Sequence, residues 1–315
     1  MKPYFSVVIP LYNKENYIEK TLHSVLNQAF QDFEVIVVND GSTDKSPEKV
    51  RAFKDSRIRL ISIENSGVSH ARNTGILEAK ADFIAFLDAD DLWEKNHLKD
   101  LLQLIQNFPN CGLYATAYVK KSGERFLECK FKDIPKGFEW SGIVQNYFES
   151  SIYNSIAWAS AVAIPKNTFE TIGLFDDTIT LGAGEDTDMW IRIALKHPIA
   201  FSNKVSAIHN LHAENRLSNT NTNLRHFINL DNYESIAKSN PSLKRYLDIN
   251  RFSIGLKYIL SSNKEKGRSY FEKIDKQNLN WKQRVLVNQP KEVLIFLVIV
   301  QNVLRKMKIQ LTAFH

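Results

Sequence analysis

FIAFLDADDLW, residues 83–93, joins a continuous apolar run to a cluster of three aspartates. A short uninterrupted apolar run is typical of a strand that is buried on both faces of a sheet. Asp88, Asp90 and Asp91 follow directly where such a strand would end. The cluster is either a solvated acidic turn or a site for a metal ion and a charged ligand. Its surroundings decide between these interpretations.

Strands and helices are predicted to alternate over the first ninety residues. Apolar runs at 5–10 and 33–38, and the alternating stretch 58–63, predict three further strands. Helical spacing or helix-start signals lie between them, at residues 15–28, 46–54 and 68–79. Strands that are apolar on both faces and alternate with helices indicate an α/β fold with a mostly parallel sheet.

Each of the four predicted strands ends in unusual polar residues. These are PLYN (10–13), NDGS (39–42), NSG (65–67) and DAD (88–90). Any one of them is explained by the local needs of a turn. Ligands of open α/β sheets bind beyond the carboxyl ends of the strands, however, and all four lie at that edge. Together they predict a functional site.

The remainder of the chain is less regular. Residues 112–119 and 157–164 look like strands, and 186–196 predict a helix preceded by the flexible, acidic GAGED (182–186). From residue 221 onward the segments are predicted to be helical, with 17 Lys and Arg against 7 Asp and Glu, or +10, whereas the preceding residues carry 24 against 28, or −4. We therefore divide the chain into a sheet domain, 1–220, and a basic helical region, 221–315.

Composition narrows the functional class. Cys111 and Cys129 form no CxxC pair, and the first residues lack the features of a signal peptide, so we expect a cytoplasmic protein. The basic region contains no recognisable nucleic-acid-binding module, and we expect no nucleic-acid partner.

The apolar run 293–300, followed by RKMK at 305–308, is too short to span a bilayer, which takes about 20 residues. Three interpretations stay open for 293–308: a helix peripheral on the inner face of the membrane, a homodimer interface, or packing on the sheet domain.

Five stretches carry a family resemblance: VVIPLYNKENYIEKTLHSVLNQ (7–28), VIVVNDGSTDKS (35–46), NSGVSHARNTGI (65–76), FIAFLDADD (83–91) and GEDTDMWIRIA (184–194). In this order and spacing they resemble glycosyltransferase family 2, which are nucleotide-sugar enzymes. The resemblance covers about the first 215 residues. It implies a GT-A fold, with a Rossmann-like, mostly parallel sheet flanked by helices, over residues 1–220. The helical extension carries no comparable motif.

The resemblance implies where a nucleotide-sugar donor, expected to be a UDP-sugar, would bind. Pro10 and Tyr12 would border the uracil pocket, where the aromatic face packs on the base. Asp40 would accept a hydrogen bond from the uracil imide N–H, and Arg72 would donate to a base carbonyl. Asp88 would reach the ribose or assist the metal shell.

A nucleoside diphosphate leaving group needs positive charge, and Mn²⁺ or Mg²⁺ prefers carboxylate oxygens and water. The resemblance assigns the metal to Asp90. It also suggests a histidine that completes the metal or diphosphate site. His212 fits this better than His209, because a polar stretch follows it as in relatives. Asp91 is expected to cap the following helix.

The acceptor hydroxyl must lose a proton as it attacks the anomeric carbon, and a carboxylate can serve as the general base. The resemblance gives this role to Asp186 and acceptor binding to Glu185, although acidic residues at this position also complement a helix N-terminus. Inversion of the anomeric configuration is likewise implied by the family.

These expectations describe a metal-dependent glycosyltransferase of hexosyltransferase type. It would act on a hydroxyl of a saccharide or lipid-linked glycan in cell-surface polysaccharide synthesis. A sugar-nucleotide pyrophosphorylase is disfavoured, because PLYNK (10–14) lacks the Gly-rich loop that a triphosphate needs. A non-catalytic sugar- or lipid-binding protein is the alternative, and it has no need of Asp88, Asp90 and Asp186.

Overall fold

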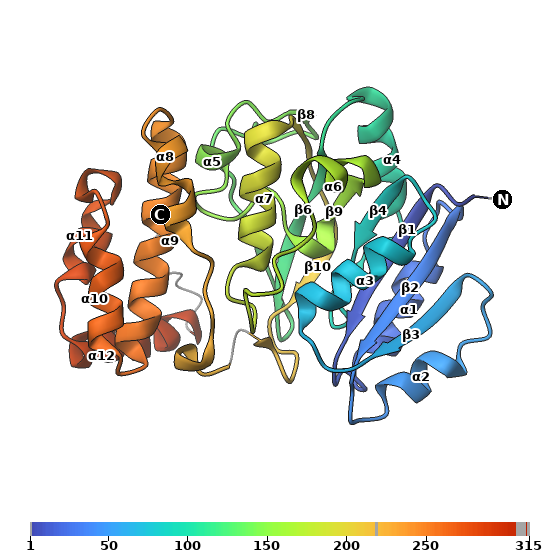
Figure 1. Cartoon of the computed structure of the whole chain (residues 1–315), viewed down its shortest axis with the longest axis horizontal. Helices are drawn as coiled ribbons and strands as arrows, with labels where there is room; N and C mark the ends of the chain where they lie inside the picture. The colour runs from blue at the N-terminus through green and yellow to red at the C-terminus, as the bar shows by residue number, and fades with distance from the viewer. Residues whose placement is uncertain (1, 218–219, 307–312, 314–315) are drawn as a thin grey trace.

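The computed structural model describes residues 2–217, 220–306 and 313 (Figure 1). Its first part alternates strand and helix, as the apolar patterns predict. The elements are β1 (Phe5–Leu11), α1 (Ile18–Leu26), β2 (Phe33–Asp40), α2 (Ser46–Ala52), β3 (Ile58–Ile63), α3 (Val68–Glu78) and β4 (Phe83–Phe86). The residues of β2 are all buried and those of β1 nearly so, which explains why these strands are apolar on both faces.

Four parallel strands, in the order β3-β2-β1-β4, form the centre of this part. Leu11 at the end of β1 pairs with Asn39 of β2, and Asp40 pairs with Ile63 of β3. Because the strands are parallel and in register, the polar loops that follow them lie at one edge of the sheet.

Helix α3 packs on β1 and β2. Gly75 makes this close approach possible, since a Cβ at that position would lie 2.3 Å from the Val8 Cγ1 atom. The glycine is unfavourable for the helix by itself, but it lets α3 settle against the sheet. Its presence inside a predicted helix is therefore explained by packing.

The sheet continues beyond β4 in the order β9-β6-β10-β5, and this half is mixed. Its strands are β5 (Leu92–Trp93), β6 (Leu113–Ser122), β7 (Arg125–Glu128), β8 (Ser141–Ile143), β9 (Val162–Pro165) and β10 (Ile199–Asn210). β6 and β10 are parallel, whereas β9 is antiparallel to both β4 and β6. The α/β class is confirmed, and the parallel arrangement is confined to β3-β2-β1-β4 and the β6–β10 pair.

The predicted strand at 157–164 is only half a strand. Ala159–Ala161 form a 3₁₀ turn, η1, and β9 begins at Val162. The turn is closed by the Ala161 N–H, which donates to the Trp158 carbonyl at 2.7 Å. The apolar composition of this stretch reflects burial, which turns and strands share.

The second half of the sheet is flanked by α4 (His97–Asn107), α5 (Tyr147–Ser150), α6 (Lys166–Ile172) and α7 (Glu185–Lys196). α7 begins one residue before the predicted start. The helix packs on the sheet through an apolar face, since Met189, Trp190 and Ile193 are buried in the core.

Residues 220–306 are mainly helical and lie at the end of the molecule opposite β1–β3 (Figure 1). Its elements are η3 (Thr222–Leu224), η4 (Leu230–Tyr233), α8 (Glu234–Ala237), α9 (Pro241–Leu260), α10 (Lys264–Glu272), η5 (Lys276–Asn278), α11 (Trp281–Val287) and α12 (Lys291–Lys306). α9 contributes Leu243 and Leu247 to the main core, and Phe252 and Ile259 to a second, smaller cluster. Because α9 joins the two cores, the division at 220/221 stays a prediction.

Cys111 and Cys129 are both free thiols. The apolar run at 293–300 forms part of α12, where Leu294 packs in the second cluster while Phe296 is 62% exposed. Met307 and Lys308, part of the expected basic anchor, lie outside the described residues. Among the helices of the described chain, none combines the length and the apolar character needed to cross a membrane.

Candidate active site

A cavity of about 380 Å³ opens where the loops after β1, β2 and β4 meet the start of α7. Eight of the nine predicted site residues line it: Pro10, Tyr12, Asp40, Arg72, Asp88, Asp90, Glu185 and Asp186. A further part of the wall comes from His209, Arg216 and Leu217, which lie in or beyond the end of β10. The fold therefore gathers residues from both halves of the sheet around one space.

Arg72 projects from α3 and is only 3% exposed. Its Nη2 donates to Asp88 Oδ1 at 2.9 Å, and its Nη1 donates to Glu185 Oε1 at 3.3 Å. Burial by itself would lower the pKa of Arg72, but the two carboxylates outweigh burial and raise the pKa above its ordinary value. Arg72 thus stays charged and holds the loop after β4 beside the start of α7. Its expected contact with a base carbonyl stays a prediction.

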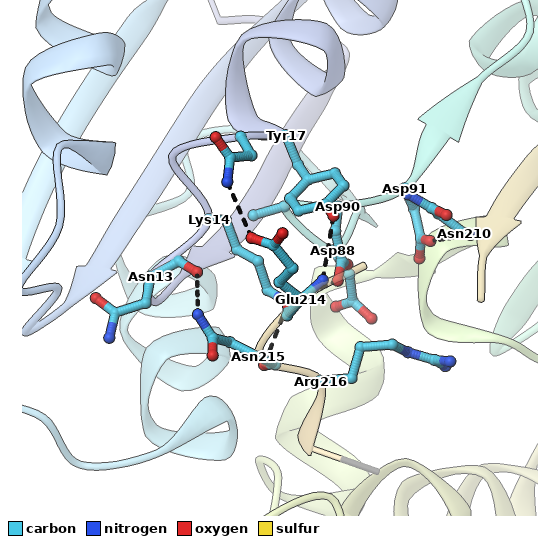
Figure 2. A network of polar contacts seen from close by, with 12 residues as sticks. Asn13, Lys14, Tyr17, Asp88, Asp90, Asp91, Asn210, Glu214, Asn215 and Arg216 are labelled. Carbon is cyan, nitrogen blue, oxygen red and sulfur yellow. Dashed lines mark hydrogen bonds and ion pairs between the residues drawn. The ribbon is translucent and has the colours of Figure 1, made fainter. Parts of the chain in front are cut away.

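Asp90 lies beside Lys14, which follows β1. The Lys14 ammonium is 2.7 Å from Asp90 Oδ2, and it also donates to the carbonyl oxygen of Glu214 at 2.6 Å. Figure 2 shows the Lys14 side chain reaching from the loop after β1 toward Asp90, with Glu214 and Asn215 beside it. Burial raises the pKa of Asp90, while Lys14 opposes this rise. The expected metal carboxylate is therefore held by an internal cation.

Asp91 does not cap a helix, contrary to expectation. α4 begins only at His97, with Asn96 as its N-cap residue. Asp91 is buried, and its Oδ2 and Oδ1 accept hydrogen bonds from Ser160 Oγ at 2.7 Å and from the Asn210 N–H at 2.9 Å. Burial, together with the charges of Asp90 and Asp88, raises the pKa of Asp91 well above its usual range. Its role is to tie the aspartate loop to η1 and β10.

Asp40 is occupied by the backbone of the neighbouring loop. Its two carboxylate oxygens accept the N–H groups of Ser66 and Gly67, at 2.7 and 2.9 Å. Gly67 precedes α3 with a φ of 93°, a conformation that favours glycine. Asp40 thereby fixes the start of the helix that carries Arg72. Its expected contact with uracil would use the remaining lone pairs of the same oxygens and stays a prediction.

Tyr12 and Pro10 lie on the cavity wall at the end of β1. The Tyr12 side chain is 39% exposed, a large value for an aromatic residue beside a buried strand. An exposed aromatic face at the mouth of a cavity is suited to packing on a flat ligand. The placement agrees with the expected position of a base.

The start of α7 supplies two carboxylates of different character. Glu185 is 6% exposed; burial and the neighbouring Asp186 raise its pKa, and Arg72 opposes the rise. Asp186 is half-buried on the cavity, and its Oδ1 accepts the Thr187 N–H at 2.7 Å. Gly184, with a φ of 107°, lets the chain turn sharply into the helix. Glu185 is therefore engaged by Arg72, while Asp186 faces the space where an acceptor would lie.

The structure brings His209, rather than His212, to the cavity. The His212 Nε2 atom lies 2.9 Å from the Ser122 Oγ atom at the end of β6. His209 stacks on Trp158 with ring centroids 4.7 Å apart, and its Nε2 is 2.9 Å from Arg216 Nη2. Burial, followed by Arg216 and Lys120, lowers the pKa of His209 to about 4. His209 is therefore neutral near pH 7 and accepts a hydrogen bond from Arg216.

Sequence reasoning did not single out Lys14, Trp158 and Arg216, which line the cavity, or Ser160, which holds the aspartate loop. Ser160 is buried; its hydroxyl donates to Asp91 and accepts the Asp88 N–H at 3.1 Å. Lys14 carried a signal, since it stands two residues after Tyr12 in the strand-end loop. Ser160 carried none, because its stretch was interpreted as a strand.

The carboxylates of the cavity resemble the donors that a divalent ion prefers. Within the part of the chain that the structure describes, no three His, Cys, Asp or Glu side chains cluster as a closed metal site. Mg²⁺ and Mn²⁺ do not require one, because such ions are commonly held by one or two carboxylates together with substrate phosphates and water. Asp88 and Asp90 on one loop supply such a pair. They fit an ion that binds together with a nucleotide diphosphate.

The glycosyl transferase family 2 model matches residues 6–168. An uncharacterized glycosyltransferase of Rickettsia bellii is 31% identical over 234 residues, which cover 72% of this chain and 32% of the relative. The minor teichoic acid biosynthesis protein GgaA of Bacillus subtilis is 32% identical over 203 residues, 61% of this chain and 43% of the relative. The chain thus spans less than half the length of these relatives. Residues 1–349 of S. aureus TarS, in complex with UDP-GlcNAc, share the fold, with a TM-score of 0.59 and 19% identity over 83% of this chain and 72% of that one.

Proposed function

The chain belongs to glycosyltransferase family 2 and has the GT-A fold, and on this basis we propose that it is an inverting, metal-dependent glycosyltransferase. It moves a hexose from a UDP-sugar to a hydroxyl of a saccharide or lipid-linked glycan. The observation that carries the proposal is the meeting of Asp88, Asp90 and Asp186 in one cavity. Turn formation explains each carboxylate locally but does not explain why all three face the same space.

The donor half of the cavity lies at the ends of β1, β2 and β4. Tyr12 packs on the base and Asp40 accepts its imide N–H, while Asp88 binds the ribose. Arg72 fixes the position of Asp88 through their 2.9 Å ion pair, in addition to its expected contact with the base. The TarS structure that shares this fold contains UDP-GlcNAc, which supports a UDP-sugar as donor here.

The diphosphate lies next to Asp90 in this proposal. Asp90 and Asp88 would hold Mn²⁺ or Mg²⁺, which when bound supplies Lewis-acid charge to the leaving diphosphate. Arg216 also lines this part of the cavity, and its guanidinium can pair with phosphate oxygens. His212, which contacts Ser122 instead of the cavity, would need to move in order to serve as a ligand.

Asp186 accepts the proton of the acceptor hydroxyl as that oxygen attacks the anomeric carbon. The new glycosidic bond forms on one face of the sugar while the bond to the diphosphate breaks on the other, so the configuration inverts. Glu185 contacts only the edge of the acceptor, because Arg72 already engages the Oε1 atom of Glu185. Asp186, with one oxygen held by the Thr187 N–H, is oriented for the proton transfer.

The acceptor class is inferred from the relatives. GgaA is named for minor teichoic acid biosynthesis, and we infer a role in cell-surface polysaccharide synthesis. With this role the protein would act in the cytoplasm, where α12 would make a peripheral contact with the inner face of the membrane. The helix exposes apolar side chains suited to that contact: Val293, Ile295, Phe296, Leu297, Val298, Ile299 and Val303.

Binding and turnover test the proposal separately. Thermal stabilisation by UDP and UDP-sugars is measured with and without Mn²⁺, and UDP release is followed with each sugar. Asp90→Asn is expected to lose the Mn²⁺-dependent stabilisation. Asp186→Asn is expected to keep it and to lose about a thousandfold in turnover, because the general base is gone. Asp82→Asn is the matched control, since the Asp82 side chain is exposed, lies 2.6 Å from the Lys2 ammonium and is not part of the cavity lining.

Two results would contradict the proposal. If no nucleotide sugar stabilises the protein and Asp90→Asn behaves as Asp82→Asn, the central claim fails. If nucleotide binding is retained but Asp186→Asn turns over as the wild type does, the assigned base is wrong. Stabilisation by nucleotide sugars without release of UDP would favour the non-catalytic alternative.

A further inference from the structure

Lys14 joins three oxygen atoms from two distant parts of the chain. Its ammonium contacts Asp90 Oδ2 at 2.7 Å, the Glu214 carbonyl at 2.6 Å and the Asn215 carbonyl at 3.3 Å. An ammonium has three donors, and each has an acceptor here. The Lys14 side chain is only 11% exposed, so this arrangement is a packed one.

Residues 211–217, which we call the wall segment, are fastened to the loop after β1 by further contacts around this lysine (Figure 2). Asn16 Nδ2 donates to Glu214 Oε2 at 2.9 Å, and the Glu214 N–H donates to the Tyr17 hydroxyl at 3.2 Å. Asn215, Arg216 and Leu217 of this segment line the cavity. The position of one cavity wall thus depends on the same lysine that neutralises Asp90.

Asp90 cannot serve both cations in this geometry. A hard divalent ion binds carboxylate oxygen at about 2.0–2.1 Å and keeps a near-octahedral shell. One of the two carboxylate oxygens, Asp90 Oδ2, is already paired with the Lys14 ammonium at 2.7 Å, so an ion on either oxygen would lie close to that positive charge. Like charges so close in a partly buried site repel strongly, so the ammonium must leave when the ion arrives.

We propose that Lys14 neutralises Asp90 when no metal ion is bound and holds the wall segment in place, an interaction that we call the latch. A divalent cation at Asp90 breaks this interaction. The inference rests on the proposed metal role of Asp90 but not on turnover. Without the ion, Lys14 neutralises Asp90 and holds the carbonyls of residues 214 and 215. With the ion, the lysine leaves Asp90, the wall segment loses its central tie, and the cavity opens on that side.

The first test is Mn²⁺ binding to the protein without nucleotide, measured from the paramagnetic resonance of the free ion. Lys14→Met is expected to bind Mn²⁺ roughly tenfold more tightly than the wild type, because the competing cation is gone and the competent state is no longer rare. Lys14→Arg keeps the charge and is expected to retain weak binding. Lys20→Met, on the exposed side of α1, is the control and should behave as the wild type.

The second test is hydrogen exchange of residues 211–217 with and without Mn²⁺. The ion should raise exchange in the wild type, whereas in Lys14→Met exchange should already be high and insensitive to the ion. Asn16→Ala removes an outer contact only, so it should raise exchange while leaving Mn²⁺ affinity unchanged. These measurements need no donor or acceptor, so they separate the latch from the glycosyl-transfer proposal.

The proposal is overturned if Lys14→Met, folded by its thermal melt, binds Mn²⁺ with wild-type affinity. It is also overturned if saturating Mn²⁺ leaves the exchange of the wall segment in the wild type unchanged. If Lys14→Arg binds Mn²⁺ as tightly as Lys14→Met does, then the shape of the lysine side chain, and not its charge, weakens Mn²⁺ binding in the wild type. That result would also reject the counter-ion role.

Discussion

Two buried arginines lie in different parts of this molecule, one at the cavity and one in the helical region, and their surroundings look alike. Arg72 pairs with Asp88 and Glu185 at the cavity, and Arg251 of α9 pairs with Asp231, Glu234 and Asp248 in the helical region. Arg72 is 3% exposed and Arg251 is 1% exposed. Burial and ion pairing therefore do not tell which of the two serves a ligand.

The two clusters differ in what their carboxylates contact besides the arginine. Asp88 and Glu185 both line the cavity, and in the described chain the buried Arg72 Nε has no hydrogen-bond partner. Asp248 is instead fully buried, and its oxygens also meet Lys244, the Asp275 N–H and the Asn278 side chain. The charged groups around Arg72 lack some hydrogen-bond partners and border an open cavity, whereas protein groups supply the further partners of Asp248 beside Arg251. An incomplete cluster indicates a binding site, and a complete one indicates a structural tie.

The largest expected effect separates the clusters by activity. Arg72→Met should lower kcat/KM by about a hundredfold or more, because Asp88 and Glu185 lose the group that holds them in place. Arg251→Met should leave kcat/KM within about twofold when assayed well below its melting temperature, since its partners do not reach the cavity. UDP release measures both variants. A comparable loss in Arg251→Met would show that the helical region contributes to the site.

For the free energy of unfolding, Arg251→Met should have a larger effect than Arg72→Met. Removing the partner of a fully buried charge costs about 3 kcal/mol or more, and Arg251→Met should show this cost in urea unfolding because the side chain of its partner Asp248 is 0% exposed. Arg72→Met should cost less, because the Asp88 side chain is 32% exposed to water and Glu185, whose pKa is raised, can take up a proton. Equal losses in the two variants would contradict the distinction between an open and a closed cluster.

Asp91 gives a smaller effect that sharpens the comparison within the aspartate loop. Asp91→Asn keeps the oxygen that accepts the Asn210 N–H, and its amide can donate to Ser160 Oγ in place of the present bond. We expect a loss of about 1 kcal/mol in unfolding free energy and retention of the Mn²⁺-dependent stabilisation by UDP. The same substitution at Asp90 should remove that stabilisation. If Asp91→Asn removes it as well, then Asp91 contacts the ligand.

The smallest expected effect is a difference in pH dependence. The hydrogen bond from Lys273 lowers the pKa of Asp231, and Lys244 and Arg251 lower that of Glu234 in spite of burial. Their contribution to stability is present above the unfolded pKa values of 3.8 and 4.5 and is lost as the pH falls through the lowered folded values. Because these groups are partly exposed, the loss should stay below about 1 kcal/mol.

Glu185 has the opposite sign. Burial and Asp186 raise its folded pKa above 4.5, so its ionisation costs stability above the folded value and this cost fades as the pH falls toward 4.5. Hydrogen exchange, corrected for its intrinsic pH dependence, should therefore stay the same or slow at the start of α7 as the pH falls from 7 to 4.5. In α9 it should increase as the pH falls below about 4.5. Parallel behaviour of the two helices would contradict the assigned pKa directions.

Much of the site was predictable because its signals are local. The strand pattern at 83–86 and the aspartates after it are neighbours in sequence, and parallel pairing of β1, β2 and β4 carries the polar loops to one edge. Pro10, Tyr12, Asp40, Asp88 and Asp90 were therefore predictable as cavity residues. Arg72, Glu185 and Asp186 needed the family resemblance, because nothing local marks the start of α7 as a neighbour of β4.

The failures involve partners that are far apart along the chain. Asp91 was expected to cap the next helix, yet its partners are Ser160 and Asn210. His212 was preferred to His209 because of the residues that follow it, whereas the register of β10 against β6 decides which of the two reaches the cavity. A local pattern carries no information about such contacts.

The fold class, the edge of the sheet that carries the site and the residue types available there can be inferred from the order of the amino acids alone. These follow from burial periodicity and turn chemistry, which act over a few residues. Which charges meet depends instead on how the chain packs in three dimensions. Lys14 stands 76 positions from Asp90 and 200 from Glu214, and their contact exists because the packed sheet brings the end of β1 beside the loop after β4 and the chain beyond β10. Long-range packing, which fixes distance and burial together, made the aspartate loop a site held by an internal cation.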